Sequence, residues 1–216
     1  MGRVVYQRVG CVAWVGLNRP EALNALDATM ADELLEAWRR IDRDPEVAVA
    51  VVAGSGGNAF CAGADLGDSR AGPSALADIG APSLRLAKPL IAAVHGYALG
   101  AGCRLAMSVD IVIAATNAQF GYAAAPAGEN GFLRRPLRHL PQREALEVVM
   151  AGRRIGADRA FALGLLTEVV PADEVLSAAV HWTTRLAADP DTAVRPTEGY
   201  HQGGITLMNG VGVPNG

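Results

Sequence analysis

Two apolar stretches of this chain are each followed directly by a turn rich in glycine and alanine. VAVAVVA, at 47–53, is continuous and β-branched, which is typical of a strand covered on both faces in an α/β sheet. PLIAAV, at 89–94, has the same apolar character. The first stretch opens into GSGGNAFCAGADL (54–66) and the second into HGYALGAGCRLAMSVD (95–110). The sequence therefore predicts an α/β fold in which two strands end at glycine-rich turns.

These turns favour exposed backbone N–H groups, because glycine removes side-chain bulk where a ligand approaches the main chain. We expect a short helix from about Ala64 after the first turn and another over 103–107 after the second. The first N–H groups of a helix lack intrahelical partners. Ligands gather at the carboxyl ends of strands in open α/β sheets, so two such helix starts can present two N–H groups to one oxygen. The turns indicate an oxyanion hole, although a tight strand-to-helix connection would explain either turn alone.

The other expected elements follow from local patterns. A hairpin or a pair of adjacent strands is predicted over 4–9 and 11–17, and a loop over 17–26. Asp27 can cap a helix that begins near Ala28 and buries a stripe at helical spacing. The remaining helices are expected at 141–150, 157–163 and 172–188, with a strand at 168–170.

Length, composition and charge exclude several classes of protein. The 216 residues are half hydrophobic, which suits one domain with a sizeable core. A net charge of −3 and a pI of about 5.8 give no support for binding nucleic acid or an anionic membrane. The apolar stretches are too short to span a bilayer, and three cysteines without metal-ligand spacing predict neither a disulfide nor a metal site. We expect a cytoplasmic protein with a core domain at 1–189 and an irregular or disordered Gly/Asn-rich tail at 190–216.

Five motifs occur in an order that resembles the crotonase superfamily, the enoyl-CoA hydratase/isomerase family. They are LNRPEALNAL (17–26), AFCAGADL (59–66), KPLIAAVHGYALGAGCRLAMSVDIVIA (88–114), AQFG (118–121) and MAGRRIGADRAFALGLLTEVVP (150–171). The resemblance implies a crotonase-like spiral of ββα units with a C-terminal helical region, here shortened. It also implies an acyl-CoA or enoyl-CoA ligand, no cofactor beyond the coenzyme A moiety, and a homo-oligomer, either a trimer or a hexamer.

The resemblance assigns roles to individual residues. The backbone N–H groups of Ala64 and Ala101 would hold the thioester carbonyl. Five residues would lie along the coenzyme A moiety: Arg19, Ala22, Ala62, Asp65 and Leu66. Of these, Ala62 would lie near the adenine. For Asp65, capping of its local helix is an equally good interpretation.

Both glutamates that handle the water and the proton in hydratases of this family are replaced. Arg104 stands at the first position and Ala124 at the second. Arginine cannot act as a base at neutral pH, and alanine carries no exchangeable proton. The usual hydratase mechanism therefore lacks both of its acid/base groups.

Other residues remain as candidate proton carriers or ligand contacts. Arg104 either pairs with Glu129 or an anionic group of the ligand, or is simply a solvated or snorkelling arginine. Glu129 lies in the loop AGENG and is the best substitute base, ahead of Tyr122 and His139. His95, Cys61 and Cys103 are expected to be structural.

Two functions stay open. The chain is an enzyme of the enoyl-CoA hydratase/isomerase group that stabilises a thioester enolate, or it is a non-catalytic acyl-CoA binder that has lost its acid/base groups.

Overall fold

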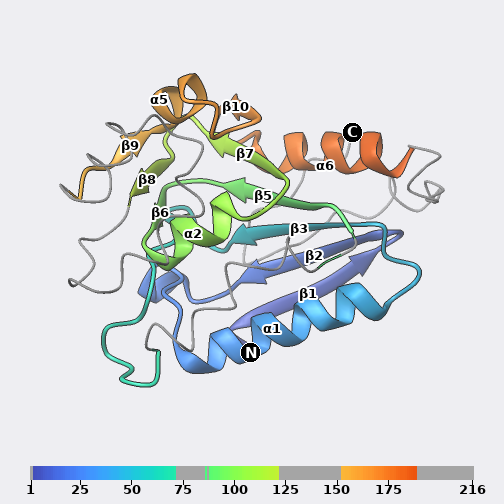
Figure 1. The fold of residues 1–216 in the computed structure, drawn as a ribbon, viewed down its shortest axis with the longest axis horizontal. Coiled ribbons are helices and arrows are strands. Elements are labelled where there is room, and N and C mark those ends of the chain that lie inside the picture. The colour runs from blue at the N-terminus through green and yellow to red at the C-terminus, as the bar shows by residue number, and fades with distance from the viewer. Residues whose placement is uncertain (1, 72–85, 87, 122–151, 189–216) are drawn as a thin grey trace.

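The computed structural model describes residues 2–71, 86, 88–121 and 152–188, and its main feature is a six-stranded sheet (Figure 1). In spatial order, its strands are β1 (Val4–Val9), β2 (Val12–Leu17), β3 (Val49–Gly54), β5 (Leu90–Val94), β7 (Ile111–Ala115) and β10 (Glu168–Val170). β1 and β2 form the predicted antiparallel hairpin, and every other neighbouring pair is parallel. The α/β class is confirmed.

A smaller sheet of four strands lies beside the main one. Its strands are β4 (Ala59–Cys61), β6 (Tyr97–Leu99), β8 (Gln119–Gly121) and β9 (Ile155–Gly156). β4, β6 and β8 run parallel, and each follows a strand of the main sheet along the chain. The chain thus passes three times from the large sheet to the small one, and β5, β6 and α2 (Ala101–Met107) form one strand–strand–helix unit.

Helices cover the two faces of the main sheet differently. α6 (Val175–Ala187) packs on one face, against buried residues such as Trp14 and Val51. α1 (Ala28–Arg43), α2 and the small sheet pack on the other face, against residues such as Val15 and Val52. Adjacent strand residues thus alternate between two apolar layers, which explains why 47–53 is apolar throughout.

α1 begins and is buried as its sequence predicts. The Asp27 carboxylate accepts a hydrogen bond from the Met30 N–H at 2.8 Å, which caps the helix. The apolar stripe of α1 is buried: Met30, Ala31, Leu34, Ala37, Trp38 and Ile41.

The helix expected from Ala64 is wrong. Ala64 instead forms a parallel β-bridge with Leu26, and the chain turns through the remaining described residues to position 71. Asp65 and Asp68 each accept a hydrogen bond from the backbone N–H two residues later. Such side-chain turns compete with helix formation.

Smaller differences concern the ends of elements. α2 begins at Ala101, two residues earlier than expected, and the last helix begins at Val175 rather than near 172. The predicted helix at 157–163 is α5 (Ala157–Ala162), and a short 3-10 helix, η1 (Pro20–Ala22), lies within the predicted loop. The helix expected at 141–150 and the tail at 190–216 lie outside the described residues. In the part of the chain that is described, no helix has the length and apolar character to cross a membrane.

Candidate active site

The two glycine turns meet at one edge of the small sheet. β4 and β6 are parallel neighbours, so both strands end on the same side. The chain leaves β4 through Ala62, Gly63 and Ala64, and leaves β6 through Gly100 into Ala101. The two residues that the family resemblance assigns as N–H donors therefore follow adjacent strand ends.

Glycine allows the two turns to pack backbone against backbone. A Cβ atom on Gly63 would lie 2.9 Å from the Leu99 carbonyl oxygen and 3.6 Å from the Ala101 nitrogen. A Cβ atom on Gly102 would lie 2.2 Å from the Cys61 carbonyl oxygen. Any side chain at these positions would push the two turns apart, so glycine sets how closely Ala64 can approach Ala101.

Hydrogen bonds fix the direction of the Ala64 amide. The Leu26 N–H donates to the Gly63 carbonyl at 2.7 Å, and the Asp65 N–H donates to the Leu26 carbonyl at 2.9 Å. In such a parallel bridge the central residue, here Ala64, directs its own N–H to the opposite side. No described residue accepts a hydrogen bond from that N–H.

The Ala101 amide is in a similar situation at the start of α2. The first helical hydrogen bond runs from the Arg104 N–H to the Gly100 carbonyl at 3.0 Å. The Ala101 N–H precedes it and has no acceptor among the residues described. Two donors are therefore available on turns that contact each other, and both alanines are half-buried.

Arg104 is buried, with a relative exposure of 8%. The expectation that it is simply solvated is therefore wrong, because α2 packs into the layer between the two sheets. Arg104 also lies in the last turn of this seven-residue helix. Its predicted partner Glu129 lies outside the described residues, as do Tyr122, Ala124 and His139.

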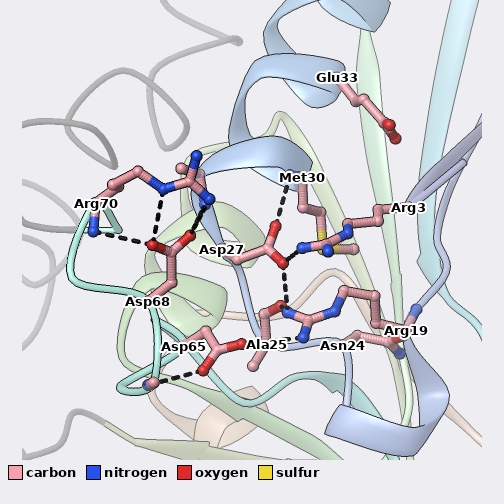
Figure 2. A network of polar contacts seen from close by, with 12 residues as sticks. Arg3, Arg19, Asn24, Ala25, Asp27, Met30, Glu33, Asp65, Asp68 and Arg70 are labelled. Carbon is pink, nitrogen blue, oxygen red and sulfur yellow. Dashed lines mark hydrogen bonds and ion pairs between the residues drawn. The ribbon is translucent and has the colours of Figure 1, made fainter.

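The residues predicted along coenzyme A lie on two neighbouring segments. Figure 2 shows the Arg19 guanidinium between two carboxylates, 3.0 Å from Asp65 and 3.1 Å from Asp27. Arg3 also contacts Asp27. The two arginines and the two aspartates balance in charge. Because Arg19 pairs with Asp65, it joins the loop before α1 to the turn after β4.

Asp65 does not cap a helix, since none follows among the described residues. Its carboxylate accepts the Gly67 N–H at 2.9 Å and pairs with Arg19. The Gly67 hydrogen bond and Arg19 lower the pKa of Asp65 below its usual value. Leu66 beside it is 98% exposed, whereas Ala22 and Ala62 are half-buried.

His95 is structural, as expected. Its Nε2 lies 2.6 Å from the Gly56 carbonyl oxygen. Burial lowers the pKa of His95, so at neutral pH the ring is uncharged and Nε2–H donates to this carbonyl. The histidine thereby holds the loop between β3 and β4.

The cysteines are not poised as nucleophiles. Cys61 and Cys103 are buried, and burial raises the pKa of the Cys61 thiol to about 12. The described residues contain no cluster of side chains that could hold a metal ion.

One buried polar residue near these turns was not predicted from the sequence. Asn24 is fully buried and bonds to the chain around β4, although its loop gives only a turn signal. The hint in the sequence is an amide between apolar residues in ALNAL, but it does not identify the partners.

Comparison with known proteins identifies the fold and the family. The model of the enoyl-CoA hydratase/isomerase family matches residues 7–202. The chain belongs to this family. Its fold matches the enoyl-CoA hydratase structure of Bacillus anthracis with a TM-score of 0.78 and 31% identity, over 87% of this chain and 77% of that one. The crotonase-like fold predicted from the motifs is thereby confirmed.

Two curated family members illustrate the range of relatives. The (E)-benzylidenesuccinyl-CoA hydratase of Thauera aromatica is 36% identical over 87% of this chain and 77% of its own length. The carnitinyl-CoA dehydratase of Proteus mirabilis is 37% identical over 86% of this chain and 74% of its own. These family members carry names for different reactions.

Proposed function

We propose that this family member binds an acyl-CoA or enoyl-CoA thioester and polarises its carbonyl with the N–H groups of Ala64 and Ala101. The observation that carries the proposal is the contact between the two turns. The Ala64 N–H and the Ala101 N–H on these turns have no acceptor among the described residues. The names of the relatives support a coenzyme A thioester as the ligand. One such donor contributes about 10²- to 10³-fold to the rate when charge develops on the oxygen.

The reaction that fits this site is stabilisation of a thioester enolate. Removal of a proton next to the carbonyl, or addition to a conjugated double bond, places negative charge on the thioester oxygen. Two fixed N–H donors stabilise that charge without reorganisation. The chain would thus act as a lyase or isomerase of the enoyl-CoA hydratase/isomerase group.

The proton must then be carried by a group other than the usual glutamates. Arg104 replaces one of them and is buried on α2, the helix that begins at Ala101, where its positive charge favours an anionic ligand group or Glu129. Glu129 is the base that we propose, and we propose Tyr122 and Ala124 as substrate-binding residues.

The coenzyme A moiety would run over the surface formed by the loop before α1 and the turn after β4. Leu66 offers an exposed apolar side chain there, and Ala22 and Ala62 leave room for the ligand. Arg19 is paired with two carboxylates, so its role is to shape this surface together with Asp65. We propose no cofactor beyond the coenzyme A moiety of the ligand. We also propose that the protein forms a homo-oligomer, either a trimer or a hexamer, and light scattering would measure its size.

The replacement of both glutamates, by Arg104 and Ala124, favours a second candidate, a non-catalytic acyl-CoA binder. Incubation with a panel of enoyl-CoA thioesters separates the two, because turnover removes the absorbance of the conjugated thioester. Turnover that Glu129→Gln abolishes supports the enzyme and its base. Binding without turnover across the panel supports the binder, and absence of binding contradicts both.

A further inference from the structure

Two consecutive residues in the loop before α1 adopt the left-handed backbone conformation without being glycine. Leu23 has φ of +52° and Asn24 has φ of +55°. This conformation is uncommon for asparagine and more so for leucine. Residues held in this way persist only where surrounding contacts hold them, and they cluster at functional sites.

The Asn24 side chain shows what holds this loop. Its Nδ2 donates to the Ser55 carbonyl at 2.9 Å and to the Ala59 carbonyl at 2.8 Å. Its Oδ1 accepts from the Arg19 N–H at 2.9 Å and from the Ser55 hydroxyl at 3.3 Å. The buried carboxamide therefore uses both of its donor hydrogens, and its oxygen accepts the Arg19 N–H. The Ser55 hydroxyl has one proton, which it shares with the nearer Leu17 carbonyl at 2.7 Å. The Asn24 carboxamide ties together the two ends of the loop that leads into β4.

The backbone beside Asn24 continues these contacts toward the donor turn. The Ala62 N–H donates to the Leu23 carbonyl at 3.0 Å. Leu26 then bonds to both neighbours of Ala64, accepting from one and donating to the other. Residues 23–26 thus form a support along one side of the turn, and the Ala64 N–H faces the other side.

We propose that Asn24 is a positioning residue for the Ala64 donor, an inference that rests on the proposed function. Asn24 fixes the start of β4 through its carboxamide, and its strained backbone presents Leu23 and Leu26 to the turn. Loss of the carboxamide would let the turn move and would misdirect the Ala64 N–H, while the Ala101 donor stays in place.

The carbonyl stretching frequency of a bound saturated acyl-CoA, labelled with ¹³C at the thioester carbon, tests this proposal. Hydrogen bonds to the carbonyl lower that frequency, whereas general destabilisation of the protein does not. Asn24→Gly is the variant of choice, because glycine accepts the positive φ and removes only the carboxamide. Val51→Ala is the control, since it creates a cavity in the layer against α6, away from the turn.

We expect wild type and Val51→Ala to show the same lowered frequency on binding. We expect Asn24→Gly to lose half or more of that shift and, where turnover is measurable, to lose roughly 10- to 100-fold in kcat with less change in KM. A full shift in Asn24→Gly overturns the proposal. Wild-type protein that binds no acyl-CoA, or shows no shift, contradicts the proposed function itself and with it this inference.

Ser55→Ala provides a milder variant if Asn24→Gly does not fold. It removes the hydroxyl that contacts Asn24 Oδ1 and the Leu17 carbonyl, and leaves the Asn24 carboxamide in place. We expect a carbonyl shift between those of wild type and free ligand. A shift equal to that of wild type counts against the proposal.

Discussion

Substitution of Gly102 by alanine perturbs the contact between the two donor turns directly. The added Cβ atom would lie 2.2 Å from the Cys61 carbonyl oxygen, about 1.2 Å short of the 3.4 Å at which ordinary contacts begin. The neighbour is backbone of β4, so it cannot rotate away as a side chain can. α2 must therefore move away from β4, and the Ala101 N–H moves with it.

The size of this movement sets the expected effect. A misplacement of about 1 Å at a reacting centre can cost about 10²-fold in rate. Overpacking of a closely packed interior typically costs about 1–3 kcal/mol of stability. We expect Gly102→Ala to lower kcat/KM for the best enoyl-CoA by roughly 10²-fold, or acyl-CoA affinity where no turnover occurs.

Gly57→Ala is the matched control. A Cβ atom at Gly57 meets nothing within 4 Å, so this variant should bind and react as wild type does. Turnover, binding and urea unfolding of the two variants are compared side by side. If Gly102→Ala equals Gly57→Ala in all three measurements, the close contact between the turns does not set the donor geometry.

Three further predictions concern charged groups and thiols. Arg104→Ala should weaken acyl-CoA binding or lower the urea midpoint, because it removes a buried cation; unchanged values in both would count against a paired Arg104. The Arg70 hydrogen bonds lower the pKa of Asp68 from 3.8 to about 2, so its contribution to stability is complete above pH 4 and is lost as the pH falls through 2. Asp68→Asn should therefore flatten the acid limb of the stability profile, and an Asp68 carboxyl that titrates near pH 4 by NMR would refute this. Cys61 should resist a thiol reagent at pH 8 in the folded protein and react in denaturant, whereas rapid labelling of the native protein would contradict its burial.

The sequence predicted the parts of the fold that depend on local patterns. The strand predicted at 47–53 is β3 (Val49–Gly54) and follows from an apolar run, and the start of α1 at Ala28 follows from the Asp27 cap. β4 and β6 were missed, because each has three residues and lies inside a glycine-rich stretch. Strands this short carry almost no periodicity, and their pairing depends on partners elsewhere in the chain.

The site was predicted in the same uneven way. The family resemblance of the motifs assigns Ala64 and Ala101 as donors, which stays a prediction. The expected helix after Ala64 ignored two aspartates that form turns instead. The burial of Arg104 depends on how α2 packs against the two sheets, which the sequence alone does not show. Asn24 was missed because its main acceptors lie 31 and 35 residues further along the chain.

A crystal structure of the protein with a saturated short-chain acyl-CoA tests the central claim most directly. We predict that the thioester oxygen lies about 2.7–3.2 Å from the backbone nitrogens of both Ala64 and Ala101. A thioester oxygen that contacts neither nitrogen, with the ligand bound elsewhere on the chain, would contradict the account.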